Sequence, residues 1–290
     1  MKLIELSGEE LLLWRKKLLL KGGSSADLDW LLDIGGGLRW STLQQIHIDP
    51  NRHLRLSKTL DVLESLWCIH LDSKTPLQHL VGRCPWRDFE LEISPVALIP
   101  RQETEILVDL ALQKFDENFS GLWADLGTGS GALAVALARD LPRAVGHAVD
   151  CSKDALSLAQ SNLQRLAPKS RVSFYLGSWW EPLRPWWGSI SLVLANPPYI
   201  PSSVVDGLDP IIREHEPLIA LCGGVDGLNA CREIIFGAFN AMSNEGWLFL
   251  EHHHDQSDAV LDLMIKSGLK DVDFETDLEG IRRFALGRHP

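Results

Sequence analysis

The sequence has little of what marks secreted, metal-binding or membrane-spanning proteins. Its five cysteines are scattered and odd in number, and no C-x-x-C pair occurs, which disfavours both disulfides and a zinc site. No apolar stretch approaches the roughly 20 residues needed to span a bilayer. The apolar run from Leu11 to Leu20 is interrupted by Arg15, Lys16 and Lys17, so it does not resemble a signal peptide. We therefore expect reduced thiols in a cytoplasmic protein that has no membrane partner.

Positive charge is also scarce. Lysine and arginine together number 28 against 39 aspartates and glutamates, which gives a formal net charge of −11. Proteins that bind nucleic acid over a broad face need basic residues to neutralise phosphates. Nucleic acid is therefore not the expected partner, and only a local basic patch would change that. The length of 290 residues suits about two domains.

A glycine-rich turn between a strand and a helix is the first sign of a ligand site. Residues 122–126 are apolar apart from Asp125, and residues 132–138 have a helical pattern. The turn between them consists of Gly127, Thr128, Gly129, Ser130 and Gly131. Glycines let the backbone approach a ligand closely, and the start of a helix offers unpaired N–H groups and the positive end of a dipole.

An acidic residue follows at the distance that a nucleotide site requires. A second apolar run, residues 144–149, ends at Asp150, about 20 residues after the turn, where an acid typically binds ribose hydroxyls. The turn has the spacing G-x-G-x-G and not the G-x-G-x-x-G of dinucleotide sites, and no lysine or arginine lies between Asp125 and Ala138 to neutralise a phosphate. The pattern resembles the S-adenosylmethionine (SAM) site of Rossmann-like methyltransferases, where an acid placed like Asp125 lies near the methionine part. The alternative is that the glycines serve only helix–strand packing.

A second motif ends another buried strand. The apolar residues 190–195 run into Asn196, Pro197, Pro198 and Tyr199, and prolines cannot continue a central strand. In an open α/β sheet, ligands bind beyond the carboxyl ends of the strands, so Asn196 would stand in that crevice. Its side chain and the following carbonyls can accept hydrogen bonds from an NH2 group, while the Tyr199 ring packs over its plane. The plainer alternative is a turn that begins with Asn-Pro.

Before residue 76 the sequence has helical periodicity. A capping box of Ser7 and Glu10 marks the start of the first helix. Three helices are expected, at residues 11–20, 27–34 and 59–71. We therefore predict that residues 1–75 form a small helical domain. Four tryptophans are its expected core or groove aromatics: Trp14, Trp30, Trp40 and Trp67.

After residue 75 the pattern changes to strands. Residues 76–100 are the expected linker between domains, because apolar and acidic residues alternate over 88–93 as in one arm of a β-hairpin. Within residues 101–290 strand and helix signals alternate. The strands are expected near residues 122–126, 144–149, 172–175, 190–195, 247–251, 272–275 and 283–287. This alternation predicts an α/β fold with a mostly parallel sheet and helices on both faces.

Blocks of sequence spread over nearly the whole chain point to a family. They are residues 75–82, 98–105, 125–131, 196–200, and 216–221 with 223–228. In this order they resemble the peptide chain release factor glutamine methyltransferases of the HemK/PrmC family. The resemblance implies a helical substrate-recognition domain, a hairpin linker and a seven-stranded Rossmann-like SAM methyltransferase domain. It also implies methylation of the side-chain amide nitrogen of the glutamine in the Gly-Gly-Gln motif of release factors, and we expect a monomer.

The same resemblance assigns the cofactor contacts. The residues implied for the methionine part of SAM are Asp125, Gly127, Thr128, Gly129, Ser130 and Gly131. Asp150 is implied for the ribose hydroxyls and Trp179 for adenine, with Asn196 also near the cofactor. Three further tryptophans crowd the loop around Trp179, and we expect Trp180, Trp186 and Trp187 mainly to pack.

On the acceptor side the resemblance implies a pocket for the target amide. Asn196 and the Pro197 carbonyl would accept its hydrogen bonds, and Pro198 and Tyr199 would complete the pocket. An amide nitrogen is a poor nucleophile, and two acceptors on its N–H groups would aim its lone pair at the methyl group. The expected catalytic residues are therefore Asn196, Pro197 and Tyr199, and no histidine or carboxylate base is required.

The sequence departs from the family pattern in three places. Gln102 stands where Pro is usual, which would loosen the linker, and Ser178 stands where Asp is usual, which puts one polar contact to adenine in doubt. His252, His253 and His254 replace a run that normally contains Ile-Gly. Three histidines invite a metal site, but successive side chains at a strand end point to alternate faces. We therefore expect a solvated loop and no metal.

Two other functions fit parts of the pattern. The exocyclic NH2 of adenine or guanine can use the same acceptors as an amide, which would make the protein a SAM-dependent amino-methyltransferase of nucleic acid. The acidic net charge counts against it. The non-enzymatic alternative is a SAM-binding scaffold without turnover, against which the intact block from Asn196 to Tyr199 counts.

Overall fold

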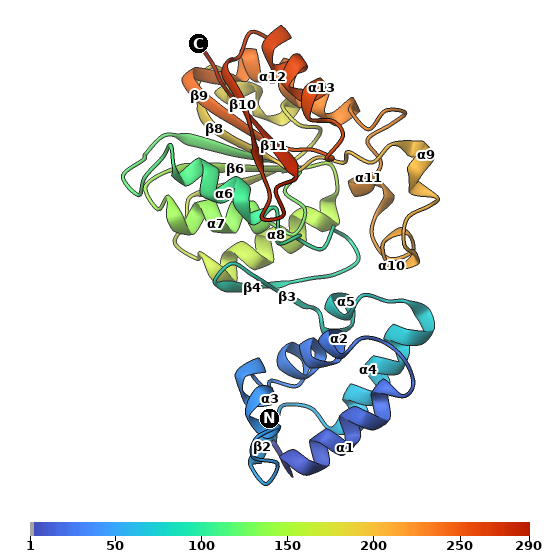
Figure 1. Ribbon diagram of the computed structural model, residues 1–290. Coiled ribbons are helices and arrows are strands. Elements are labelled where there is room, and N and C mark those ends of the chain that lie inside the picture. The colour runs from blue at the N-terminus through green and yellow to red at the C-terminus, as the bar shows by residue number, and fades with distance from the viewer. Residues whose placement is uncertain (1–2) are drawn as a thin grey trace. The chain divides into compact units, whose positions relative to one another are not determined.

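The computed structural model describes residues 3–290, which divide into two compact units (Figure 1). The small unit comprises the chain up to Cys84 together with Pro210–His215, and the large unit comprises Pro85–Asp209 and Glu216–Pro290. The segment Pro210–His215 thus belongs to the small unit, where His215 Nε2 lies 2.8 Å from the carbonyl oxygen of Ser73. The predicted division into residues 1–75, 76–100 and 101–290 assigns a function to each part of the chain, and this division stays a prediction.

Helices make up most of the small unit. They are α1 (Gly8–Leu19), α2 (Ser25–Trp30), α3 (Trp40–Ile46), α4 (Leu60–Ser73), α5 (Leu77–Val81) and α10 (Pro210–Arg213), with a π-helical turn η1 (Leu31–Gly35) after α2. The three predicted helices are confirmed as α1, α2 with η1, and α4. The capping box is also confirmed, because Glu10 N donates to Ser7 Oγ at 3.2 Å and Ser7 N donates to Glu10 Oε2 at 2.7 Å.

The small unit also contains two short strands that the helical periodicity did not predict. Two strands, β1 (Ile4–Ser7) and β2 (His53–Leu56), pair antiparallel in this unit. A four-residue strand offers only about two inward positions, which is too few for a periodic signal. Of the two positions expected for the tryptophans, core or groove, a core position is wrong for Trp40. Trp40 is 59% exposed, whereas Trp14 and Trp67 are buried and Trp30 packs against their cluster.

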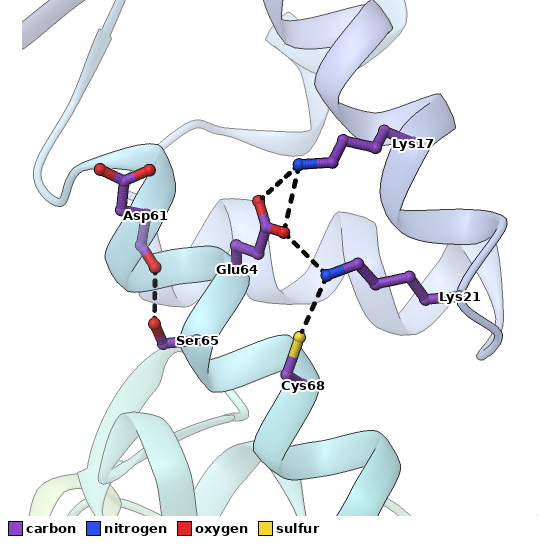
Figure 2. Close-up of polar contacts among 6 residues, drawn as sticks. All are labelled: Lys17, Lys21, Asp61, Glu64, Ser65 and Cys68. Atoms are coloured by element: carbon purple, nitrogen blue, oxygen red, sulfur yellow. Dashed lines mark hydrogen bonds and ion pairs between the residues drawn. The ribbon is translucent and has the colours of Figure 1, made fainter.

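A charged cluster joins α1 and α4 at the surface of the small unit (Figure 2). Lys17 Nζ and Lys21 Nζ lie 3.3 Å and 2.8 Å from Glu64 Oε1, and Lys21 Nζ lies 3.5 Å from Cys68 Sγ. The hydrogen bond from Lys21 lowers the pKa of Glu64 below its ordinary value. Exposed ion pairs of this kind contribute little to stability. Burial of residues such as Leu11, Leu18 and Trp67 between the helices therefore holds the unit together.

A seven-stranded sheet forms the centre of the large unit. Its strands are β5 (Leu122–Leu126), β6 (Val145–Asp150), β7 (Val172–Leu176), β8 (Ile190–Ala195), β9 (Met242–Glu251), β10 (Lys270–Thr276) and β11 (Arg282–Arg288). The order is β10-β11-β9-β8-β5-β6-β7, and β11 runs antiparallel to both of its neighbours while the other pairs are parallel. All the predicted strands are confirmed, although β9 begins at Met242, before the predicted residue 247.

Helices cover both faces of this sheet (Figure 1). The layer on one face consists of α6 (Glu105–Leu112), α7 (Ala132–Asp140) and α8 (Lys153–Leu166), and the layer on the other consists of α12 (Asn229–Ala241) and α13 (Ser257–Lys266). The shorter helices are η2 (Glu181–Trp186), α9 (Ser202–Val205) and α11 (Leu218–Leu221). The predicted hairpin is confirmed as β3 (Arg83–Trp86) with β4 (Phe89–Glu92). The predicted α/β fold class is therefore confirmed.

The order of the strands determines where a ligand can bind. From β5 the chain moves outward to β6 and β7, and it then returns to the other side of β5 to form β8 and β9. The connections on the two sides leave a crevice beyond the carboxyl end of the central strand. Leu126, Asp150 and Ala195 end the three strands that border this crevice. Over residues 3–290, no helix is long and apolar enough to cross a membrane.

Candidate active site

A cavity of about 540 Å³ occupies this crevice in the large unit. Its wall contains most of the residues predicted from the sequence: Gly127, Thr128, Gly129, Ser130, Asp150, Trp179, Asn196 and Pro198. Four predicted residues are not among the described residues that line it: Asp125, Gly131, Pro197 and Tyr199. The glycine turn and the Asn-Pro-Pro-Tyr motif therefore share one cavity, to whose wall the motif contributes Asn196 and Pro198.

Two positions of the turn require glycine for different structural reasons. Gly129 has a φ of +54°, and a Cβ there would have Ala97 Cβ as its nearest neighbour at 4.0 Å, so its backbone borders open space in the cavity. Gly131 has a φ of +84°, and its Cβ would lie 3.0 Å from the Cα of Ala159 in α8. Gly129 thus leaves room for a ligand, whereas Gly131 allows α7 and α8 to pack closely.

Asp150 ends β6 with its carboxylate fixed by backbone groups. Gly129 N donates to Asp150 Oδ2 and Ser152 N donates to Asp150 Oδ1, each at 2.9 Å. Each carboxylate oxygen has more than one lone pair, so both can still accept from a ligand hydroxyl. The hydrogen bond from Gly129 also fixes the position of the Asp150 carboxylate relative to the glycine turn.

Asp125 lies behind the turn, fully buried at the end of β5. Its Oδ2 accepts from Thr128 Oγ1 at 2.6 Å and from Ala134 N at 3.1 Å. Within the described part of the chain, its Oδ1 has no hydrogen-bond partner. Burial raises the pKa of Asp125 to about 7. A buried carboxylate oxygen without a partner is costly, and a cationic group bound at the turn would lower that cost.

Trp179 borders the cavity in a strained conformation. Its φ is +43°, in the left-handed region that bulky residues rarely adopt. Its ring lies 3.2 Å from the position of a Cβ on Gly127, so the ring and the turn are in contact. Trp180 instead is buried and donates from Nε1 to the carbonyl oxygen of Ile234 at 2.9 Å. Trp186 packs on His147, and Trp187 is 39% exposed.

Asn196 is held by residues that sequence reasoning missed. Asn196 Nδ2 donates to Thr104 Oγ1 at 3.0 Å, and Thr104 Oγ1 donates to Glu251 Oε2 at 2.7 Å. Tyr199 Oη donates to Glu251 Oε1 at 3.2 Å. Gln256 Nε2 donates to the carbonyl oxygen of Tyr199 at 2.9 Å. The sequence feature that could have identified Glu251 is an acidic residue directly after the apolar end of β9, the strand that pairs with β8.

The residues that depart from the family pattern lie in different surroundings. Gln102 Nε2 donates to the carbonyl oxygen of Pro85 at 3.2 Å, and Ser178 is exposed on the cavity wall. The expected solvated histidine loop was wrong at its first residue, because His252 is fully buried and burial lowers its pKa. His253 Nδ1 lies 2.6 Å from Asp255 Oδ1. No group of three or more potential metal ligands occurs in residues 3–290.

Comparison with known proteins identifies the family. Residues 102–208 match the model of the methyltransferase small domain. The chain is 58% identical over 286 residues to the release factor glutamine methyltransferase of Prochlorococcus marinus, and the match covers 98% of both chains. The chain belongs to the release factor glutamine methyltransferase family. A further member, from Thermosynechococcus vestitus, is 44% identical over 243 residues, with 83% of each chain covered.

Solved structures add support for the fold alone. The crystal structure of the hMettl16 catalytic domain in complex with a MAT2A 3'UTR hairpin is similar with a TM-score of 0.53 at 12% identity. The match covers 82% of this chain and 84% of that one. At this identity the similarity concerns the Rossmann-like architecture and not the substrate.

The cavity fits the methyl donor of the release factor glutamine methyltransferase family, which is SAM. SAM carries a ribose, an adenine and an amino-acid tail with a cationic ammonium group. The unpartnered oxygen of Asp125 suits a cation near the turn, and the open space at Gly129 suits close approach of a ligand to the backbone. Asp150 offers acceptors for ribose hydroxyls, and the Trp179 ring offers an aromatic face. The residues present therefore match the chemical groups of SAM.

Proposed function

We propose that this protein transfers a methyl group from SAM to the side-chain amide nitrogen of the glutamine in the Gly-Gly-Gln motif of peptide chain release factors. The observation that carries this proposal is that Asn196 stands on the wall of the same cavity as the glycine turn and Asp150. A cofactor held by the turn and an amide held by Asn196 would then meet within one cavity. Family membership supports the choice of acceptor.

On the cofactor side, the chain's own residues position the methyl group. Gly127, Thr128, Gly129, Ser130 and Gly131 form the turn that receives the methionine part, with the Asp125 carboxylate behind it. Asp150 binds the ribose hydroxyls and Trp179 contacts adenine. When bound, SAM supplies an electrophilic methyl group on a positively charged sulfur. The protein contributes orientation and removal of water.

On the acceptor side, hydrogen-bond acceptors raise the reactivity of the amide nitrogen. Its lone pair is delocalised into the carbonyl, so it attacks poorly by itself. Asn196 and the carbonyl of Pro197 accept from its two N–H groups and aim the lone pair at the methyl group. Pro198 borders the cavity, and Tyr199, whose hydroxyl is bonded to Glu251, supports the motif from behind. The proton leaves after transfer, so no strong base is needed.

The proposal extends to the partners of the protein. The substrate is a protein and not a nucleic acid, since the net charge is −11. We propose that the enzyme acts in the cytoplasm as a monomer, and that residues 1–75 contact the release factor away from the methylated glutamine. Release factors act where translation is terminated, so enzyme and substrate would share one compartment.

Methyl transfer from labelled SAM tests the proposal directly. The acceptors are a purified bacterial release factor, its variant with Ala in place of the Gly-Gly-Gln glutamine, duplex DNA and ribosomal RNA. Label on the intact factor alone is the expected result. Label on either nucleic acid would replace the proposal with the amino-methyltransferase function, and SAM binding without label on any acceptor would indicate a scaffold.

A further inference from the structure

A network of hydrogen-bonded polar groups runs from Asn196 through Thr104, which also lines the cavity, to the buried Glu251. It runs from Asn196 Nδ2 to Thr104 Oγ1 at 3.0 Å and from Thr104 Oγ1 to Glu251 Oε2 at 2.7 Å. Thr104 is 4% exposed and Glu251 is 2% exposed. The three residues come from different elements, since Asn196 follows β8, Glu251 ends β9 and Thr104 directly precedes α6. These hydrogen bonds therefore depend on the folded core and not on local sequence.

The chemistry of the three groups fixes which of them donates each hydrogen bond and which accepts it. Burial raises the pKa of Glu251 to about 7. In its ionised form, above that pH, Glu251 only accepts hydrogen bonds, so the single proton of the Thr104 hydroxyl must then point at Glu251. The Thr104 oxygen is then an acceptor toward Asn196, and only the NH2 end of the Asn196 amide can donate to it. The two ends of an asparagine amide have nearly the same shape but opposite hydrogen-bonding character. A threonine bonded to a carboxylate thus selects one of the two orientations of Asn196.

The selected orientation is the one that the reaction needs. With Nδ2 occupied by Thr104, the oxygen Oδ1 is the end that remains for a ligand in the cavity. An incoming amide NH2 group offers donors, so it needs an acceptor there. In the flipped orientation two NH2 groups would face each other, and a buried donor would be left without a partner.

The same carboxylate also fixes the far end of the motif. Tyr199 Oη donates to Glu251 Oε1 at 3.2 Å, so both oxygens of Glu251 are used by side chains. The other charged groups that act on Glu251 are Arg283, from β11, and Glu103. Glu251 therefore connects the first and last residues of the Asn-Pro-Pro-Tyr motif within one buried network.

We propose that Thr104 and Glu251 are positioning residues that hold the Asn196 amide with its oxygen toward the acceptor amide of the substrate. This inference rests on the proposed function and deepens it. Neither residue takes the proton or touches the reacting nitrogen. Their contribution is to fix which end of Asn196 the substrate meets before it binds, so that no reorientation is needed during the reaction.

The decisive variant is Thr104→Val, which keeps the shape of the side chain and removes the hydroxyl. We expect kcat for methylation of the release factor to fall on the order of 10²-fold, as for loss of an oriented hydrogen-bonding group in an active site. The Kd for SAM, measured by calorimetry, should change less than about threefold, because no cofactor contact is assigned to the hydroxyl. Thr104→Ser restores the hydroxyl and should recover kcat to within about threefold of the wild type. Thr276→Val, on the partly exposed strand β10, is the matched control.

A second variant tests whether Thr104 and Glu251 act as one unit. Glu251→Met keeps the length of the side chain and removes both acceptors, which frees the Thr104 proton to point at Asn196 and favours the flipped amide. Its loss of kcat should be within about threefold of that of Thr104→Val, because it also removes the acceptor of Tyr199, and the double variant should lose no more than Glu251→Met alone. Additive losses, or a Thr104→Val enzyme within about threefold of the wild type, would overturn the inference. Failure of the wild type itself to methylate the factor would instead overturn the proposed function and this inference with it.

Discussion

Two buried carboxylates, Asp125 and Glu251, lie at the carboxyl ends of β5 and β9, which are separated in the sheet by β8. Burial raises the pKa of each to about 7, and each accepts from a threonine hydroxyl, at 2.6 Å from Thr128 and at 2.7 Å from Thr104. They differ in their second oxygen. Asp125 Oδ1 has no partner in the described chain, whereas Glu251 Oε1 accepts from Tyr199. The carboxylate behind the glycine turn thus keeps one oxygen without a partner, whereas both oxygens of the carboxylate near Asn196 hold the protein's own side chains.

The largest effect should follow from Asn196→Ala. Removal of the amide eliminates an acceptor for the substrate nitrogen, and we expect kcat to fall on the order of 10²- to 10³-fold. The Kd for SAM should rise by less than about tenfold, because the turn and Asp150 stay in place. Single-turnover methylation at saturating SAM, together with calorimetry, separates the two quantities. Asn118→Ala, at an exposed position, is the control. A loss that extra SAM restores would place Asn196 on the cofactor side instead.

Asp125→Asn should have the opposite effect to Asn196→Ala, because it should weaken SAM binding and leave the transfer rate at saturating SAM nearly unchanged. The Asn oxygen can still accept from Thr128 and Ala134, but its NH2 group then replaces the oxygen that has no partner. A donor at that position repels a cationic ligand, so the Kd for SAM should rise about tenfold to hundredfold. At saturating SAM the transfer rate should return to near the wild-type value. An unchanged Kd would show that the ammonium group of SAM does not approach Asp125.

The pKa of Asp125 adds a pH test on the same side of the cavity. A bound cation favours the charged carboxylate, so SAM binding should release a proton near pH 6.5 and weaken as the pH falls below about 7. In the free protein the raised pKa means that the contribution of Asp125 to stability is complete below about pH 4 and lost as the pH rises through about 7. Calorimetry in two buffers of different ionisation enthalpy measures the released proton. Asp125→Asn should abolish it, and Thr104→Val should not.

Substitutions at two glycines should separate an effect on helix packing from an effect on ligand binding. In Gly131→Ala the new Cβ lies 3.0 Å from Ala159 Cα, so α7 and α8 must shift, and we expect a loss of about 1–3 kcal/mol of stability. In Gly129→Ala the Cβ meets no atom closer than 4.0 Å, so only backbone strain of about 1–2 kcal/mol remains. The affinity for SAM should nevertheless fall roughly tenfold in Gly129→Ala, because the methyl group enters the cavity. Thermal unfolding and SAM titration of both variants would contradict this division if Gly131→Ala bound SAM less tightly than Gly129→Ala.

The sequence allowed prediction of local features and not of contacts between distant residues. Asp150 and Asn196 were predictable because each directly follows an apolar strand and ends at the ligand side of a parallel sheet. The link between Thr104 and Glu251 joins residues that are 147 positions apart, and no local pattern shows such a pair. Strand β9 was predicted too short because its first half, Ser243–Gly246, is polar or glycine, whereas Leu248–Leu250 is apolar. Pairing with β8, rather than periodicity, extends it to Met242.

The smallest effect is expected from Tyr199→Phe, which decides between two roles for this residue. The substitution keeps the ring and removes the hydroxyl that donates to Glu251 Oε1. Because Thr104 still donates to the other oxygen, Asn196 keeps its orientation, and kcat should fall only about threefold. Loss of a donor should also raise the pKa of Glu251 further, with Arg283 and Glu103 unchanged around it. Because the proposed orientation of Asn196 requires the ionised carboxylate, the fall of kcat on acidification should then begin at a higher pH than in the wild type. A loss as large as that of Asn196→Ala would mean that the hydroxyl itself contacts the target amide, in addition to the ring packing that the sequence predicted.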